Sequence, residues 1–208
     1  MRMNRIETAL VNSAPRRWLQ QAVEVPMLLR LGGRMAGGTA LEIGCGRGAG
    51  IELILDRFDA DRVVGIDLDE RMVARARQRF AEHEAVEVRV GDATAVDLPD
   101  ASTDAVFDFG IVHHVPDWRA AIAEVARVLR PGGRFYYSEV TKHALDRPTY
   151  RLLFDHPADD RFTAEDLVAA LEERGLRTGG RYRTVVGGDY TLGVAERTFQ
   201  RPTTEEER

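Results

Sequence analysis

The sequence predicts an α/β fold in which a mainly parallel sheet carries helices on both faces. From about residue 40, short apolar segments alternate with segments of helix length. The first apolar segment runs into a glycine-rich turn at 44–50, and the second ends in a carboxylate, Asp67. Strands separated by helices need crossover connections, which favour parallel pairing and a sheet covered on both sides.

The strand and helix signals of this central region can be placed in order. Strands are expected at 40–44, 62–67, 86–91, 104–112 and 133–140. Helices fit between them at 48–58, 69–84 and 117–130. Asp69 is a suitable N-cap for the second helix, and Pro131 with Gly132 ends the third. The segment 86–90 alternates strictly between apolar and polar residues, which predicts an edge strand with one wet face.

The flanking segments are expected to extend this core. A helix at 15–31, bent at Pro26, precedes it. Residues 141–161 contain two prolines and scattered aromatics and are interpreted as an insertion with short helices. A helix capped by Thr163 is expected to run to Leu176, with Asp166 in the capping-box position. Two strands, 181–186 and 191–198, form a hairpin.

These signals predict a single domain over residues 1–208. Its expected parts are an N-terminal helical cap (1–38), a cofactor-binding core (39–140), an acceptor-side insertion (141–161), a C-terminal helix and hairpin (162–200) and a disordered tail (201–208).

Composition excludes several classes of protein. Hydrophobic residues make up 44% of the chain and charged residues 30%, which are ordinary globular values. No run of 18 apolar residues is present, so no membrane span is expected, and the first residues lack a signal-like apolar stretch. The single cysteine, Cys45, excludes an intrachain disulfide and an all-cysteine metal site, and we expect no bound metal. A cytoplasmic location fits these features.

The charge is unevenly distributed. Residues 1–38 contain six arginines and two glutamates, a net +4, which leaves −9 for the rest of a chain whose net charge is −5. The overall charge argues against a general nucleic-acid binder. The basic segment is either an arm that meets an acidic partner or, more commonly, a solvated helix face near an acidic body.

The glycine turn predicts an adenosine-type cofactor. Gly44-x-Gly46-x-x-Ala49 fits the dinucleotide fingerprint, but Glu42 just before the turn would repel a pyrophosphate. S-adenosylmethionine has no phosphate, and its ammonium suits an acid at this place. Asp67 can accept from both ribose hydroxyls, and Asp92 can accept from the adenine amino group.

Five sequence pieces strengthen this interpretation. They are ALEIGCGRGAG (40–50), VVGIDLDERMVARAR (63–77), VRVGDATAVDLPDASTDAVF (88–107), IVHHVPDW (111–118) and VARVLRPGGRFYYSE (125–139). In this order and spacing, the chain resembles the class I S-adenosylmethionine-dependent methyltransferases of the small-molecule, type 11-like kind. The resemblance covers residues 38 to 140, and the C-terminal helix and hairpin match the family's ending.

The resemblance implies a fold and a set of cofactor contacts. The implied fold is a Rossmann-like, seven-stranded mixed sheet of order 3-2-1-4-5-7-6, with strand 7 antiparallel. The implied cofactor-binding residues are Glu42, Gly44, Cys45 and Gly46 around the methionine moiety, Asp67 on the ribose, Leu68, Asp92 and Ala93 at the adenine, and Phe109 and Gly110 beside the methionyl part. The product would be S-adenosylhomocysteine.

Two departures from the family pattern are visible. Asp100 follows Leu98-Pro99 where the family often has an aromatic residue, which predicts a looser adenine wall. The Asn-Pro-Pro-aromatic tetrad of enzymes that methylate adenine or glutamine amides is absent, and Gly110-Ile-Val-His113 stands in its place. This argues against those two substrates.

The reaction that the resemblance implies needs few catalytic groups. Methyl transfer from a sulfonium is an in-line displacement, so positioning supplies much of the catalysis and a base is needed only where the acceptor must lose a proton. The ionisable groups expected on the rim are His113, His114, Glu139 and His143, with His156 on the insertion. His114 is our candidate for a base or acceptor-orienting residue. Alternatively, the histidine pair shapes the turn and packs against Trp118.

The acceptor pocket is expected between the insertion and the N-terminal helix. Its candidate lining residues are Trp18, Met27, Leu28, Tyr150, Leu152, Leu153 and Phe154. Such a lining favours a small, partly hydrophobic acceptor, although the same residues suit a core or a homodimer contact equally well. Three alternatives to a small-molecule methyltransferase stay open: a non-catalytic cofactor-binding module, an RNA or protein methyltransferase that uses the basic N-terminal arm, and a nicotinamide oxidoreductase.

Overall fold

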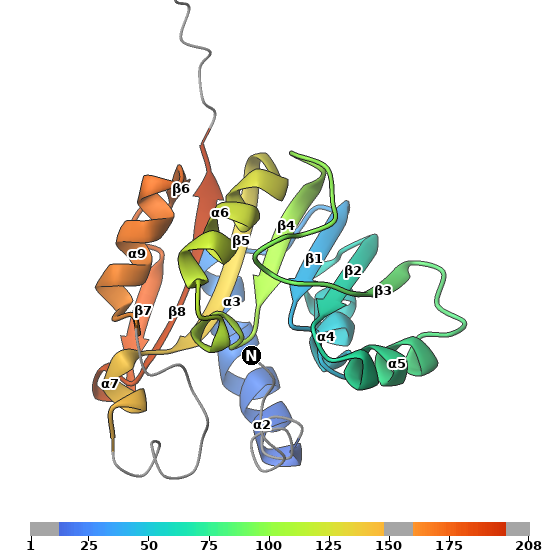
Figure 1. Ribbon diagram of the computed structural model, residues 1–208, viewed down its shortest axis with the longest axis horizontal. Coiled ribbons are helices and arrows are strands. Elements are labelled where there is room, and N and C mark those ends of the chain that lie inside the picture. Colours follow the sequence, from blue (N-terminus) through green and yellow to red (C-terminus); the bar gives the residue numbers. More distant parts are fainter. Residues whose placement is uncertain (1–12, 148–159, 199–208) are drawn as a thin grey trace, which may run out of the picture.

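The computed structural model describes residues 13–147 and 160–198, which form one mixed sheet covered by helices (Figure 1). The strands are β1 Thr39–Ile43, β2 Arg62–Asp67, β3 Val86–Val90, β4 Thr103–Asp108, β5 Leu129–Val140, β6 Leu176–Arg177, β7 Tyr182–Val185 and β8 Tyr190–Arg197. The helices are α2 Ala14–Leu19, α3 Val25–Gly32, α4 Ala49–Phe58, α5 Glu70–Arg79, α6 Trp118–Val128, α7 Lys142–Leu145 and α9 Ala164–Glu173. Shorter helical turns are η1 Gln20–Glu24, η2 Val112–His114 and η3 Val186–Gly188.

The strand order confirms the prediction. The sheet runs β3-β2-β1-β4-β5-β8-β6, with β1 to β5 parallel and β8 antiparallel to β5. The sixth strand of the expected seven is divided in two, because β6 and β7 pair with different parts of β8. Gly179 and Gly180, both with positive φ, lie between the two pieces and turn the chain out of the ladder.

The edge position of β3 is confirmed as well. Within the described residues β3 pairs only with β2, and only Val88 of its five residues is buried. Strands β1 and β4 lie inside the sheet and are buried along almost their whole length. Two apolar cores follow from this arrangement. One packs α6 and α9 on one face, and the other packs α3, α4 and α5 on the opposite face.

Several element ends differ from the expectation. The strand predicted at 104–112 ends at Asp108, because Gly110 has φ +91° and the chain then forms η2. The third helix ends at Val128, and β5 begins at Leu129 rather than at residue 133. The helix expected to reach Leu176 ends at Glu173.

The N-terminal helix is continuous through Pro26 and has one π turn, Gln20–Glu24, directly before α3. The Val25 N–H donates to the Gln20 carbonyl across this turn. Proline has no N–H and its ring crowds the preceding turn, so a widened turn ahead of it relieves that conflict.

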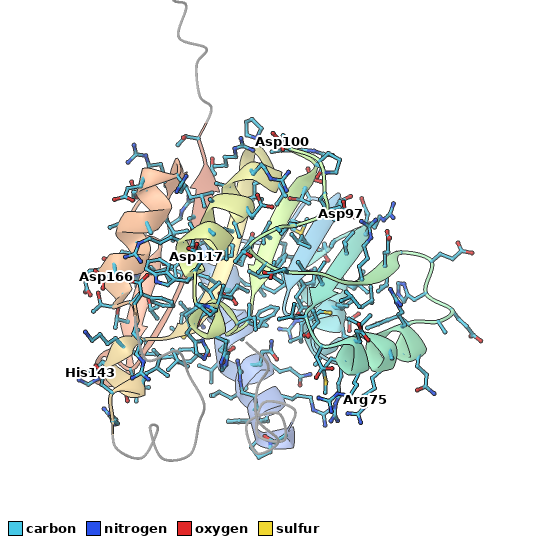
Figure 2. The ribbon with its side chains drawn as sticks, in the orientation of Figure 1. Arg75, Asp97, Asp100, Asp117, His143 and Asp166 are labelled. Carbon is cyan, nitrogen blue, oxygen red and sulfur yellow. The ribbon has the colours of Figure 1, made fainter. Side chains whose placement is uncertain are left out.

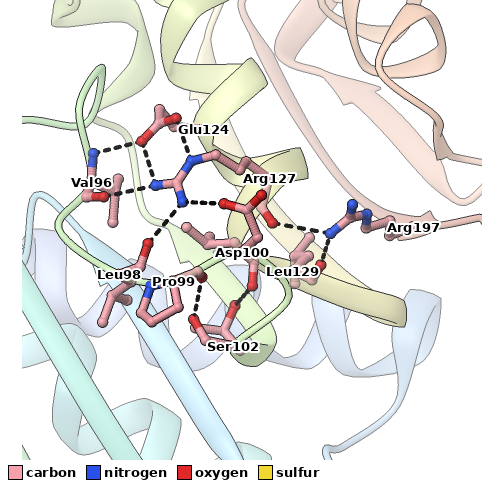
Figure 3. Close-up of polar contacts among 11 residues, drawn as sticks. Val96, Leu98, Pro99, Asp100, Ser102, Glu124, Arg127, Leu129 and Arg197 are labelled. Atoms are coloured by element: carbon pink, nitrogen blue, oxygen red, sulfur yellow. Dashed lines mark hydrogen bonds and ion pairs between the residues drawn. The ribbon is translucent and has the colours of Figure 1, made fainter.

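Arg127 near the end of α6 fixes the loop that joins β3 to β4 (Figure 3). Its guanidinium donates to the carbonyls of Val96 and Leu98 at 2.7 and 2.8 Å, and to the carboxylates of Glu124 and Asp100, each at 2.7 Å. Asp100 therefore contributes an ion pair where an aromatic residue is common in the family. The loop wall expected to be loose is tied to α6 by these bonds.

We expect Arg127→Met to lower the free energy of unfolding by about 1–3 kcal/mol, because two partly buried carbonyls lose a charged donor. Arg130→Met is the matched control. Arg130 is half-exposed and pairs with Asp104, so its removal should cost less than about 0.5 kcal/mol. Urea denaturation measures both values. Equal effects of the two substitutions would contradict the role assigned to Arg127.

Candidate functional site

The turn after β1 has one open position. Gly44, Gly46 and Gly48 have φ values of +67°, +53° and +81°, which L side chains rarely adopt. A Cβ at Gly44 would lie 2.5 Å from Ile111, and one at Gly48 would lie 2.4 Å from Phe80. A Cβ at Gly46 would meet nothing within 4 Å. The turn is thus packed on both sides and open at Gly46, where a ligand can approach the backbone.

Asp67, at the end of β2, is held in a fixed orientation by two backbone groups. Its Oδ2 accepts from the Gly46 N–H and its Oδ1 from the Asp69 N–H, both at 2.8 Å. Partial burial raises the pKa of Asp67, and the two N–H bonds oppose that rise. Each oxygen keeps lone pairs that can accept from a ligand hydroxyl.

A cavity of about 290 Å³ lies beside Asp67. It is bounded by the segments that follow β1, β2, β3 and β4, where parallel strands of this type bind ligands. The predicted site residues that the structure brings together on its wall are Gly44, Asp67, Leu68, Asp92, Ala93 and His114. Asp92 is fixed by Thr94, whose N–H and hydroxyl both donate to its Oδ1 at 2.8 Å.

The other predicted site residues lie outside the wall of this cavity. Cys45 is buried, and its Sγ would be 3.1 Å from a Cβ at Gly65, so it packs against β2, and burial raises the pKa of its thiol. Glu42 and Phe109 lie together at the start of α4, next to the position that a Cβ of Gly50 would occupy. Gly50 is required there because that Cβ would overlap the Glu42 carboxylate.

Glu42 is a buried acid with an oxygen that can still accept a hydrogen bond. It is 3% exposed, and its Oε2 accepts no hydrogen bond from any residue that the structure describes. Burial raises the pKa of Glu42 well above its ordinary value, and the nearby Asp67 and Asp108 raise it further. A cation next to the turn would reverse this rise, because it would favour the ionised form.

Asp108, the last residue of β4, is a further residue of the site that was not predicted from the sequence. Its Oδ1 accepts from the N–H groups of Gly110 and Ile111 at 3.1 and 2.9 Å, which holds the chain in its sharp turn after the strand. Burial and the neighbouring Glu139 raise the pKa of Asp108 well above its ordinary value. A polar residue at the end of an apolar run was the available signal.

Glu139 on β5 organises the histidine pair. Its Oε1 accepts from the Val112 N–H at 2.6 Å, and its Oε2 contacts His113 Nδ1. Burial raises the pKa of Glu139 to about 7, against the opposing effect of its hydrogen bonds. The rings of His113 and His114 lie 4.1 Å apart, and His114 alone of the two reaches the cavity wall.

The remaining rim candidates are separated from the cavity. His143 on α7 pairs with Asp189 at 2.6 Å and lies on the opposite side of the molecule from α5 (Figure 2). Leu28 is fully buried in the core, so the expectation that it lines an acceptor pocket was wrong, and Met27 is partly buried and packs against that core. Trp18 is 66% exposed. His156, Tyr150, Leu152, Leu153 and Phe154 lie outside the described residues.

Residues 13–147 and 160–198 hold no grouping of three or more histidine, cysteine or acidic side chains arranged to bind a metal ion. None of the helices in these ranges is long and apolar enough to cross a membrane.

The sheet order and the position of the cavity define a Rossmann-like protein with a nucleoside-sized site at the strand ends. Residues 41–137 match the family model described as a methyltransferase domain. This match and the curated relatives support a class I S-adenosylmethionine-dependent methyltransferase.

Curated relatives agree with this assignment. The chain is 38% identical over 167 residues to a probable S-adenosylmethionine-dependent methyltransferase of Mycolicibacterium smegmatis, covering 80% of this chain and 61% of the relative. It is 32% identical over 167 residues to a fatty-acid O-methyltransferase of the same organism, covering 79% and 55%. The chain thus spans about three fifths or less of the length of these two relatives.

Solved structures share the fold at low identity. A methyltransferase from Mesorhizobium loti, named as S-adenosylmethionine dependent, superposes with a TM-score of 0.70 at 21% identity, covering 86% of this chain and all of that chain. A geranyl diphosphate C-methyltransferase from Streptomyces coelicolor, solved with Mg²⁺, geranyl diphosphate and S-adenosyl-L-homocysteine, gives 0.71 at 18% identity, covering 86% and 79%.

The raised pKa of Glu139 predicts a pH-dependent stability. The folded state holds the carboxyl proton more tightly than the unfolded chain, so this contribution is complete below the unfolded pKa of about 4.3 and is lost as pH rises through about 7. We therefore expect the melting temperature of Glu139→Gln, measured relative to that of the unsubstituted protein, to increase as the pH rises from 5 to 8. Differential scanning fluorimetry measures the gain, with the exposed Glu84→Gln as control. A constant difference across this range would contradict the prediction.

Proposed function

We propose that this protein transfers the methyl group of S-adenosylmethionine to a small, partly hydrophobic acceptor. The observation that carries the proposal is Asp67, which two N–H groups hold on the wall of a cavity that Asp92 and Ala93 also line. In this arrangement Asp67 would accept from the ribose hydroxyls. Asp92 would accept from the adenine amino group, and Leu68 would pack beside the ring.

The buried acids around the turn favour a cofactor that carries positive charge and no phosphate. Glu42 has an unpartnered buried oxygen next to the glycine turn, and a pyrophosphate there would face a low-dielectric site that already contains acids. An ammonium or sulfonium would instead be stabilised. This argues for S-adenosylmethionine over a nicotinamide dinucleotide, with Phe109 and Gly110 beside its methionyl part.

The role of the protein in this reaction is mainly to position the two reactants. S-adenosylmethionine supplies a methyl group that its sulfonium has already activated for in-line displacement. The chain's residues orient the two reactants, exclude water and, for a hydroxyl or amine acceptor, remove one proton. His114 lies on the cavity wall and is our candidate for orienting the acceptor or accepting that proton. Glu139 holds the neighbouring His113 and so fixes the segment that carries both rings.

Two features support a small acceptor. Curated relatives include a fatty-acid O-methyltransferase and a malonyl-[acyl-carrier protein] O-methyltransferase of Serratia marcescens, the latter 37% identical over 118 residues, or 57% of this chain and 44% of the relative. The basic N-terminal arm, which would favour an RNA or protein acceptor, is partly neutralised within the chain. Arg16 pairs with Glu24 and Arg34 pairs with Asp59.

A non-catalytic binding module would bind the cofactor equally and release no S-adenosylhomocysteine with any acceptor.

Asp67→Ala should weaken S-adenosylmethionine binding by about a hundredfold or more, because the ribose loses a charged acceptor and the Gly46 N–H loses its partner. Isothermal titration calorimetry measures the dissociation constant. Asp61→Ala is the matched control, since Asp61 binds the Gly38 N–H at the opposite end of β2. Its dissociation constant should stay within about twofold of the unsubstituted value. Unchanged binding by Asp67→Ala would refute the site.

The raised pKa of Glu42 predicts that cofactor affinity rises with pH. Its raised pKa means that a larger fraction is neutral at low pH, and only the ionised form attracts the cofactor's cationic groups. Calorimetry at pH 6 and pH 8, in buffers of different ionisation enthalpy, should show tighter binding at pH 8 and proton release on binding. Glu42→Gln should bind more weakly and lose most of the pH dependence, whereas Glu52→Gln on α4 should not. The same pH dependence in Glu42→Gln would exclude this role.

A further inference from the structure

We propose that the methyl acceptor is a carboxylic acid, and that Arg16 of the N-terminal helix binds its carboxylate beside Gly110. This inference rests on the proposed methyl transfer and names the acceptor class. It is carried by a polar cluster in which the N-terminal helix meets β5 and β8. The cluster consists of Arg16, Glu24, Ser138 and Tyr190.

The cluster holds the Arg16 side chain in place. Arg16 Nη1 donates to Glu24 Oε1 at 2.7 Å, and Glu24 is only 2% exposed. The Tyr190 hydroxyl donates to the same Glu24 oxygen at 3.1 Å and accepts from the Ser138 hydroxyl at 3.0 Å. The guanidinium is therefore fixed by groups from two elements, η1 and β8, while Ser138 on β5 holds Tyr190 in place. This fixation before any ligand arrives lowers the entropic cost of binding one.

The second terminal nitrogen of Arg16, Nη2, is directed to the end of β4. Its Nη2 makes one hydrogen bond within the described residues, a long one of 3.5 Å to the Tyr190 hydroxyl. A Cβ placed on Gly110 would lie 4.0 Å from this nitrogen, 3.8 Å from His113 Cε1 and 3.6 Å from the Ser138 carbonyl oxygen. The missing side chain thus leaves room for a group about the size of a methyl, at ordinary contact distance from Arg16 and His113.

This space adjoins the expected methyl donor. Gly110 is next to Ile111, whose side chain packs on Gly44 of the glycine turn and lines the cavity. Phe109, on its other side, lies next to Glu42 at the start of α4. A group bound between Arg16 and His113 would therefore lie at the methionyl end of the site, where an acceptor must lie.

Arg16 is the group that would attract an anion to this position, against the nearby acids Glu24, Asp108 and Glu139. A guanidinium offers a planar set of donors that suits a carboxylate, and Glu24 engages only one of its terminal nitrogens. The acids on the other side of the space, Asp108 and Glu139, have raised pKa values and are therefore less ionised near neutral pH than ordinary carboxyls. They repel an incoming carboxylate less than two full charges would.

The step balances without a base. A carboxylate oxygen attacks the methyl carbon, the carbon–sulfur bond breaks, and its electron pair remains on sulfur. The products are a methyl ester and the neutral thioether of S-adenosylhomocysteine, and no proton is transferred. Glu24 continues to balance Arg16 after the reaction, so the uncharged ester is held less strongly than the acid and can leave. Arg16 contacts the reacting carboxylate, whereas His113 bounds the space.

The test compares acids with uncharged analogues in the full-length chain. Hexanoate, dodecanoate and benzoate, and the matched hexanol, dodecanol and benzyl alcohol, are titrated into the protein saturated with S-adenosylhomocysteine. At least one acid should bind at least about tenfold more tightly than its alcohol, and Arg16→Met should remove this preference. Arg17→Met is the control, because Arg17 is the exposed neighbour on the same helix.

Arg16→Met leaves the Glu24 carboxylate unpaired and can destabilise the fold, so Arg16→Gln combined with Glu24→Gln provides a charge-neutral second variant. This variant should bind S-adenosylhomocysteine within about twofold of the unsubstituted protein and bind the acid at least about tenfold more weakly. Three results would overturn the inference: no acid binds, alcohols bind as well as acids, or the neutral variant keeps the acid preference. Failure of the proposed function is seen separately, as no binding of S-adenosylhomocysteine before any acid is added.

Discussion

The hydrogen bond from the Gly46 N–H to Asp67 Oδ2 connects the two parts on which the rest of the site depends. It ties the turn after β1 to the end of β2, and Asp69 fixes the other carboxylate oxygen. The bond requires a backbone with positive φ and open space at Gly46, which glycine provides. A rigid acid beside an exposed turn is a preorganised receptor for a nucleoside, because little side-chain entropy is lost when the ligand binds.

A row of buried acids extends from this point across the strand ends. Glu42, Asp108 and Glu139 belong to β1, β4 and β5, which are neighbours in the sheet. Burying acids is unfavourable unless they find donors or a cation. Asp108 uses its Oδ1 and Glu139 both of its oxygens to hold the η2 segment and His113, whereas Glu42 Oε2 and Asp108 Oδ2 are unpartnered among the described residues. The same acids thus shape the loop after β4 and favour a positively charged cofactor.

Sequence patterns within single elements were enough to predict the sheet. Interactions between elements that are distant in sequence could not be predicted. Strict alternation at 86–90 correctly indicated the edge strand, and the strand-end rule correctly brought Asp67, Asp92 and His114 to one cavity. The end of β4 was missed because apolar residues continue past it, while the turn is set by two N–H groups that bind Asp108. The cluster around Arg16 could not be predicted, because Tyr190 lies 174 residues away in sequence and no spacing indicates the contact.

A crystal structure of the protein with S-adenosylhomocysteine would test the proposed cofactor site most directly. Adenosine should occupy the 290 Å³ cavity, with both ribose hydroxyl oxygens within about 3.2 Å of the Asp67 carboxylate and the Gly46 turn beside the amino-acid moiety. A nucleoside bound elsewhere, or a ribose held by other residues while Asp67 stays bound only to backbone N–H groups, would contradict it.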